Sequence, residues 1–206
     1  MTDVDSALRE ENVDPDPVRQ FERWFEEARN AGAFQPEAAA LATATLNGAP
    51  SVRMVLVKQT GPEGFVFYSN YESRKAAELA ANPRAALMFH WETLGRVVRA
   101  EGPVQRVSRE ESAAYARSRP RGSQLSALAS PQSRPIPSRA WLEERAGELA
   151  GRYPASVGVP VGDHWGGYRL TPERFEFWQH RESRMHDRLV YTPDPGRAWK
   201  LERLAP

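Results

Sequence analysis

Three basic side chains near the C-terminus, Arg184, His186 and Arg188, are spaced two residues apart. The apolar residues around them favour an extended strand, in which alternate side chains share a face, so all three would project from one side. Like charges on one face repel each other and are not buried without an anionic partner. Asp187 would point to the opposite face and could not neutralise all three. The spacing fits a solvated basic edge strand, but we favour a groove that holds a phosphate or another small anion.

Two pairs of cations occur upstream of these three residues. Arg53 and Lys58 bracket an apolar run, which is typical of a buried strand with charged ends. They are five residues apart, so they could serve one site only through a bulge, a bend or strand-end geometry. Arg74 and Lys75 lie in the first turn of an expected helix, where cations oppose the helix dipole. That placement becomes favourable if an anion binds there, because the backbone N–H groups of a helix start are free.

A further cluster spans an expected helix-to-loop junction and contains Tyr115, Arg119 and Ser123, with Gln132 and Ser133 further along. Guanidinium and hydroxyl donors that converge on one anion form a common phosphate cradle, and the alternative is a solvated surface loop. The chain has no P-loop, no dinucleotide-binding glycine fingerprint and no nucleophile elbow. Several basic clusters without a nucleophile indicate that a cofactor carries the reaction.

The composition narrows the class of protein. The chain has 206 residues, 40% of them hydrophobic and 27% charged, with a formal net charge of +1, which is typical of a globular protein that recruits neither nucleic acid nor a membrane. The absence of cysteine excludes disulfides, thiolate metal sites and a cysteine nucleophile. The four histidines show no ligand-like spacing, so we expect no metal. No secretory signal or membrane-spanning run is recognisable, and we expect a cytoplasmic protein.

Hydrophobic periodicity and turn residues predict many strands with a few helices between them. Residues 1–15 are polar and acidic, so we expect a flexible segment there and a single domain over 16–206. Residues 118–137 are rich in proline and serine and predict a long functional loop. We expect helices over 17–32, 73–81, 108–117 and 138–151, and strands over 39–46, 50–59, 65–69, 84–92, 97–107, 165–171, 173–179, 186–192 and 198–203. This order predicts a mainly β fold with inserted helices (α+β), an antiparallel β-barrel.

Taken together and in this order, the clusters resemble the pyridoxine/pyridoxamine 5′-phosphate oxidase family. The resemblance implies an FMN-binding split β-barrel that forms a homodimer with FMN at the subunit interface. It covers residues 14–206, and its most specific segments are RMVLVK at 53–58, SRKAAEL at 73–79, SRPRGSQ at 118–124, SPQS at 130–133, HWGGY at 164–168, EFWQ at 176–179 and RMHDR at 184–188.

The resemblance also implies a role for each matching residue, with part of the FMN site supplied by the second subunit. Arg184 and His186 would lie at the substrate ring and act in catalysis. The substrate would be bound by Lys58, Tyr115, Arg119, Ser123, Arg184, Met185 and His186. FMN would be bound by Arg53, Met54, Val55, Leu56, Val57, Lys58, Tyr68, Ser69, Arg74, Lys75, Gln132, Ser133, Trp178 and Arg188.

The implied reaction belongs to vitamin B6 biosynthesis. Pyridoxine 5′-phosphate or pyridoxamine 5′-phosphate is oxidised to pyridoxal 5′-phosphate, with O2 as electron acceptor and H2O2 as product. Two alternatives stay open: a related split-barrel flavoenzyme acting on another flat anionic substrate, and a non-catalytic flavin- or pyridoxal-phosphate-binding protein. The second is kept open by Val97, which stands where family members usually have a glutamine that contacts the flavin.

Overall fold

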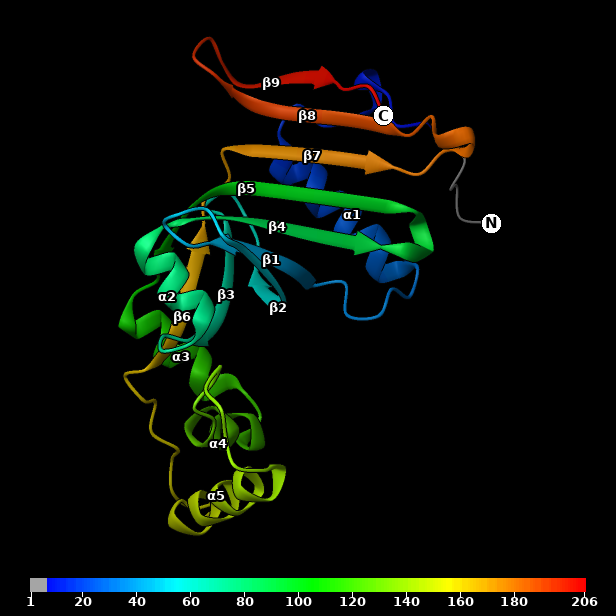
Figure 1. Ribbon diagram of the computed structural model, residues 1–206. Helices are drawn as coiled ribbons and strands as arrows, with labels where there is room; N and C mark the ends of the chain where they lie inside the picture. Colours follow the sequence, from blue (N-terminus) through cyan, green and yellow to red (C-terminus); the bar gives the residue numbers. More distant parts are fainter. Residues whose placement is uncertain (1–6) are drawn as a thin grey trace.

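The computed structural model describes residues 7–206, and its centre is a closed antiparallel β-barrel (Figure 1). Six strands form a ring in the order β4-β1-β2-β3-β6-β5, which closes because β5 also pairs with β4. The expected mainly β barrel with inserted helices is therefore confirmed. The barrel strands are β1 (Ala38–Ala44), β2 (Pro50–Gln59), β3 (Phe65–Asn70), β4 (Arg84–Trp91), β5 (Arg96–Arg106) and β6 (Trp165–Leu170).

Three more strands extend the sheet beyond the barrel. They are β7 (Arg174–Gln179), β8 (Asp187–Asp194) and β9 (Arg197–Arg203), and they follow β5 in that order. The N-terminal half of β5 pairs with both β4 and β7, whereas its last residues, 104–106, pair with β6. β5 is thus shared by the barrel and the extension (Figure 1).

Helix α1 (Pro17–Asn30) begins where the sequence predicts, with Asp16 Oδ1 accepting from the Val18 backbone N–H at 2.9 Å. Its apolar positions recur at helical spacing, so Phe21 and Trp24 share a face and both are buried. The Phe21 ring packs edge-on against Phe65 of β3, at 4.8 Å between centroids. A buried aromatic side chain of this kind contributes about 1.5–3 kcal/mol to folding. This helix therefore stabilises the barrel at its core.

The remaining helices are α2 (Arg74–Ala81), α3 (Arg109–Ser118), α4 (Arg121–Ala129) and α5 (Arg139–Arg152), with short 3-10 turns at Glu10–Asn12, Glu92–Leu94 and Glu182–Arg184. Helices α4 and α5 lie away from the barrel, beyond α3 (Figure 1). No helix of the described residues 7–206 is long and apolar enough to cross a membrane.

The prediction of a continuous loop over 118–137 is wrong, because α4 lies inside it. Pro120, Gly122 and the serines lower the local helix propensity, and no side chain caps the N-terminus of α4. A tertiary contact compensates: the Arg121 guanidinium donates to the carbonyls of Pro154 at 2.8 Å and Val157 at 3.1 Å. The helix is therefore specified by residues more than 30 positions away.

The N-terminal segment packs against the last two strands. Leu8 is buried, and its backbone N–H donates to Asp187 Oδ2 at 3.1 Å. Glu10 accepts from the Arg203 guanidinium at 2.9 Å. Residues 7–15 are thus tied to β8 and β9, whereas residues 1–6 of the expected flexible segment lie outside the described residues.

The basic segment near the C-terminus is not one continuous strand. Residues Glu182–Arg184 form a 3-10 turn, and β8 begins only at Asp187. Ser183 and Arg184 have φ values of 54° and 61°, a left-handed conformation that non-glycine residues rarely adopt. The prediction that Arg184, His186 and Arg188 project from one strand face is therefore wrong, because two of the three precede the strand.

Candidate active site

Two adjoining hollows lie beside β2 and β3, and they contain most of the residues singled out in the sequence. We call them the Arg119 hollow, of about 520 Å³, and the Lys75 hollow, of about 470 Å³. Tyr68, Ser69 and Gln132 line both. The Arg119 hollow is also lined by Leu56, Lys58, Asn70, Tyr115, Pro120, Ser123, Ser126, Ala127, Ser130 and Trp165. The Lys75 hollow is also lined by Ser51, Val52, Arg53, Met54, Val55, Arg74 and Ser133.

Strand β2 serves both hollows because its pairing with β3 is irregular. Val57 pairs with Phe67, but Gln59 pairs with Val66, so Lys58 is an extra residue in a β-bulge. The bulge is one of the irregularities that the five-residue spacing of Arg53 and Lys58 requires if both residues serve one site. Val57 is buried in the core and lines neither hollow.

Lys75 is a buried cation at the start of α2. Its Nζ donates to Ser69 Oγ at 3.0 Å, Ser73 Oγ at 3.3 Å and Gln132 Oε1 at 2.8 Å, and it forms no ion pair with any residue among 7–206. Burial, followed by repulsion from Arg53, lowers the pKa of Lys75 to about 8. A buried ammonium that has only neutral partners is poised to receive an anion.

The buried carboxylate of Glu78 organises the other two cations of the Lys75 hollow. Its oxygens accept from Arg74 Nε at 2.8 Å and from Arg53 Nη2 at 3.1 Å, and also from the hydroxyls of Ser51 and Thr43 at 2.6 and 2.5 Å. Burial acts to raise the pKa of Glu78, but these hydrogen bonds outweigh it and hold the pKa at about 2. Arg53 and Arg74 are therefore held by Glu78. Arg74 is only four residues from Glu78, but Arg53, Ser51 and Thr43 lie 25 to 35 residues away, and the sequence did not indicate those contacts.

Three aromatic rings form a near-parallel cluster at the wall of the Arg119 hollow. The Tyr68 ring lies 3.9 Å from Tyr115 and 5.5 Å from Trp165, centroid to centroid, with interplanar angles of 20° and 11°. Gly167 of β6 makes room for this arrangement, because an added Cβ would lie 2.9 Å from Tyr68 Cε1. Burial raises the pKa of Tyr68 to about 12, so its hydroxyl stays protonated at neutral pH.

Arg119 lies between α3 and α4, next to this ring cluster. Its guanidinium carbon is 4.9 Å from the Trp165 ring centroid. Among residues 7–206, no carboxylate pairs with this guanidinium and no hydrogen bond involves it, and burial lowers its pKa. Lys58, by contrast, is 3.1 Å from Glu37. Arg119 therefore contributes an unneutralised positive charge to the hollow.

A third group of predicted residues lies on β7, on β8 and in the segment between them, and lines neither hollow in a single chain. Trp178 pairs with Arg188 across the two strands, and the His186 ring lies 4.6 Å from the Trp178 ring. The Arg181 backbone N–H donates to His186 Nδ1 at 3.1 Å, so a neutral His186 carries its proton on Nε2. Arg184 is exposed in the preceding turn.

Glu176 is the anionic partner that the basic segment requires. It is 2% exposed and lies 2.8 Å from Arg188 Nε and 3.1 Å from Arg99 Nη1. Burial acts to raise the pKa of Glu176, but the Arg188 hydrogen bond and the nearby arginines lower it below its ordinary value. Glu176 is the first residue of the EFWQ segment noted in the sequence, but only the pairing of β7 with β8 brings this carboxylate to Arg188.

Comparison with known proteins gives one consistent result. Residues 25–152 match the family model described as pyridoxamine 5′-phosphate oxidase, and residues 165–206 match the pyridoxine 5′-phosphate oxidase C-terminal dimerisation region. A pyridoxine/pyridoxamine 5′-phosphate oxidase of Rubrobacter xylanophilus is 55% identical, over 98% of this chain and 92% of that protein. The corresponding enzyme of Cupriavidus taiwanensis is 51% identical, over 100% of this chain and 96% of that protein.

Two solved structures extend the comparison. PhzG from Burkholderia lata, in complex with tetrahydrophenazine-1-carboxylic acid, superposes with a TM-score of 0.90 at 30% identity, over 98% of both chains. A pyridoxamine 5′-phosphate oxidase-related, FMN-binding protein from Nostoc punctiforme has a TM-score of 0.73 at 17% identity, over 93% of this chain and 98% of that chain, and shows a shared fold.

Proposed function

This chain belongs to the pyridoxine/pyridoxamine 5′-phosphate oxidase family, and from that premise we propose its reaction. The protein binds FMN and oxidises pyridoxine 5′-phosphate and pyridoxamine 5′-phosphate to pyridoxal 5′-phosphate. When bound, FMN supplies the two-electron acceptor, which O2 reoxidises with formation of H2O2. The protein's own residues bind the two phosphates and orient the substrate.

The observation that carries this proposal is the presence of one unpaired cation in each of two adjoining hollows. Lys75 in one hollow and Arg119 in the other form no ion pair with any residue among 7–206. Two ligands that each carry a phosphate and lie side by side would supply a negative charge to each of these two cations. The shared wall of Tyr68 and Ser69 fits two molecules that touch.

In this assignment the Lys75 hollow receives the FMN phosphate. Lys75, Arg53 and Arg74 supply positive charge, and the hydroxyls of Ser69 and Ser133 supply hydrogen bonds. Glu78 neutralises part of that charge, so Lys75 is the member that gains most from a bound phosphate. The Arg119 hollow receives the substrate phosphate, which Lys58, Tyr115, Arg119 and Ser123 surround.

We propose that a second copy of the chain completes the site. Trp178, Arg184, His186 and Arg188 lie apart from both hollows within one chain, so they reach the ligands only across a subunit interface. An apolar surface on β2 supports a homodimer, because Val52 and Met54 are 69% and 65% exposed.

In this dimer His186 and Arg184 orient the substrate ring. The neutral tautomer of His186 presents its Nε2–H as a donor, which favours hydrogen bonding to a substrate oxygen over proton abstraction. Arg184 supplies a guanidinium with no partner among the described residues. Both side chains then act by orientation and charge, and we assign no general base.

A second candidate function is oxidation of another flat anionic substrate. The similarity to PhzG, whose structure contains tetrahydrophenazine-1-carboxylic acid, favours it. A carboxylate could occupy the place of the substrate phosphate beside Arg119. The two candidates differ in the ligand that the Arg119 hollow selects, so substrate comparison separates them.

The test begins with purified protein saturated with FMN. We expect a yellow protein with a flavin spectrum, and oxygen consumption with pyridoxine 5′-phosphate that far exceeds consumption with pyridoxine. Pyridoxamine 5′-phosphate and tetrahydrophenazine-1-carboxylic acid are run in parallel. A protein that does not retain FMN refutes both candidates, and turnover of the phenazine compound alone favours the second.

A further inference from the structure

The side chain of Arg119 is held from its back by an aromatic ring and not by a carboxylate. Its backbone is fixed on both sides, because its N–H donates to Ala116 O at 3.3 Å and its carbonyl accepts from Gln124 Nε2 at 2.7 Å. Its guanidinium, in contrast, has no hydrogen-bond partner among residues 7–206. A side chain with several rotatable bonds and no polar anchor needs some other contact to keep one orientation.

Trp165 provides that contact. It is the first residue of β6, is 8% exposed, and lines the Arg119 hollow. Its ring centroid is 4.9 Å from the Arg119 guanidinium carbon, within the range of a cation–π interaction. Tyr68 and Tyr115 lie nearly parallel to Trp165, with interplanar angles of 11° and 10°, and fix its ring.

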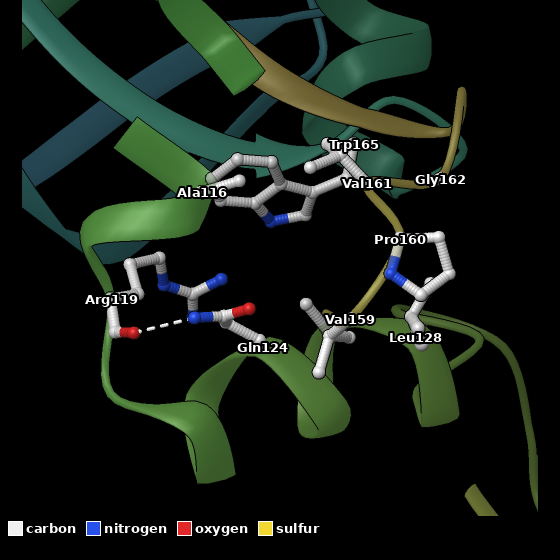
Figure 2. A pocket seen from close by; sticks show the side chains of 10 residues that line it. Ala116, Arg119, Gln124, Leu128, Val159, Pro160, Val161, Gly162 and Trp165 are labelled. Atoms are coloured by element: carbon white, nitrogen blue, oxygen red, sulfur yellow. Dashed lines mark hydrogen bonds between the residues drawn. The ribbon is translucent and has the colours of Figure 1, made fainter. Parts of the chain in front are cut away.

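The other described groups around the Arg119 guanidinium offer it no ion pair. Figure 2 shows the Arg119 guanidinium with the Trp165 indole on one side and Gln124 on the other, at the edge of a cavity of about 20 Å³. The other walls of this cavity offer no charged group and are formed by Ala116, Ala127, Leu128, Val159, Pro160, Val161 and Gly162. The face of the indole is therefore the cation–π contact that the guanidinium has on this side, where no carboxylate of the described residues lies.

We propose that Trp165 is a positioning residue that holds Arg119 so that its N–H donors point into the hollow, and that it thereby sets the preference for phosphorylated substrates. This inference rests on the proposed function, because it takes the substrate phosphate to lie against Arg119. Trp165 stabilises the cation without neutralising it, so the charge stays available to the ligand. A carboxylate in its place would compete with the phosphate.

The test compares Trp165→Leu and Trp165→Phe with the wild-type holoenzyme, using pyridoxine 5′-phosphate and pyridoxine as substrates. Loss of the ring face in Trp165→Leu is expected to lower kcat/KM for pyridoxine 5′-phosphate about 5- to 30-fold, mainly through KM. Trp165→Phe keeps an aromatic face and is expected to lower it about 2- to 5-fold. The rate with pyridoxine, which has no phosphate, is expected to fall much less in both variants.

A matched control separates positioning from general loss of packing. Trp199 of β9 packs edge-on against Phe175 and contacts no cation in the described structure. Trp199→Leu is expected to lower the melting temperature without changing the ratio of kcat/KM for the two substrates. The FMN dissociation constant, measured by flavin fluorescence, is expected to change less than kcat/KM for pyridoxine 5′-phosphate in both Trp165 variants, because Trp165 lines the Arg119 hollow and reaches the other hollow only through Tyr68.

A double-mutant cycle with Arg119→Ala gives the sharpest outcome. If Trp165 acts through Arg119, then Trp165→Leu in the Arg119→Ala background has no further effect on kcat/KM for pyridoxine 5′-phosphate. Equal losses in both backgrounds, or equal losses for both substrates, overturn the inference while leaving the proposed function intact. Absence of flavin binding or turnover in the wild type refutes the proposed function itself.

Discussion

We expect FMN binding to depend on pH, because the proposed phosphate site contains the buried lysine of α2. Lys75 has no anionic partner among the described residues, and its pKa is lowered to about 8 by burial and by Arg53. The phosphate of FMN would favour the protonated form and raise this pKa again. FMN therefore binds the protonated form best, and binding above pH 8 requires uptake of a proton.

The size of the effect follows from this pKa. Below pH 8 the lysine is already protonated, and affinity depends little on pH. Above pH 8 the affinity is expected to fall about tenfold per pH unit, or about 1.4 kcal/mol, until the pKa of the complex is reached. Between pH 7 and pH 9 the dissociation constant of FMN is therefore expected to rise about tenfold.

The assay is titration of FMN-free protein with FMN between pH 7 and 9.5, followed by quenching of flavin fluorescence. Lys75→Arg keeps its charge over this range, so its binding curve is expected to be flat. Lys75→Met is expected to bind weakly at every pH, also without a slope. Lys200→Met removes an exposed lysine of β9 and serves as the matched control, with an unchanged slope.

Calorimetry supplies an independent measure of the same proton. Titrations in buffers of different ionisation enthalpy are expected to show uptake of about 0.1 proton at pH 7 and about 0.9 at pH 9. A wild-type affinity that is constant from pH 7 to 9.5 would refute the assignment of Lys75 to the phosphate. The same conclusion follows if Lys75→Arg retains the wild-type slope.

Four further predictions concern single residues. Ser183→Gly removes a left-handed non-glycine residue and is expected to raise the free energy of unfolding by about 0.5–1 kcal/mol in urea titrations. Arg184→Ala is expected to lower kcat/KM at least tenfold with a melting temperature within about 1 °C of wild type, because Arg184 is exposed; equal losses in both would contradict its role. Glu176→Gln leaves Arg188 without its carboxylate and is expected to cost about 2–3 kcal/mol of stability, less than for a fully buried pair because the Arg188 side chain is 27% exposed. Gly167→Ala places a methyl group 2.6 Å from Val107 Cγ2 and 2.9 Å from Tyr68 Cε1, and the displaced Tyr68 ring is expected to weaken FMN and substrate binding together, measured by fluorescence and by KM.

Local sequence signals predicted most of the fold. The helices expected over 17–32 and 138–151 are present, and the side chains of Asp16 and Ser138 cap α1 and α5 by accepting hydrogen bonds from the first turn of each. These signals are reliable because the interacting groups are two or three residues apart. Helix α4 was missed because its stability depends on Arg121 and the carbonyls of 153–157, which no local pattern reports.

Many of the predicted site residues line the two hollows, but the ion pairs among them were not predicted. Arg53 and Arg188 were each expected to contact an anionic ligand, yet each already has a buried carboxylate, Glu78 and Glu176. These pairs join residues 25 and 12 positions apart. The first forms because helix α2 packs beside the barrel strands, and the second because β7 pairs with β8. The left-handed turn at Ser183 was equally invisible, because serine has no preference for that conformation.

The wall that the two hollows share has a thermodynamic consequence. Tyr68, Ser69 and Gln132 face both hollows, and Gln132 accepts hydrogen bonds from Lys75 at 2.8 Å and from Ser69 at 3.1 Å. A ligand in either hollow therefore reshapes a surface that the other ligand contacts. By linkage, whatever factor the cofactor adds to the affinity of the substrate, the substrate adds to the affinity of the cofactor. When that factor exceeds one, an enzyme with its substrate bound holds its cofactor more tightly at equilibrium than an idle one.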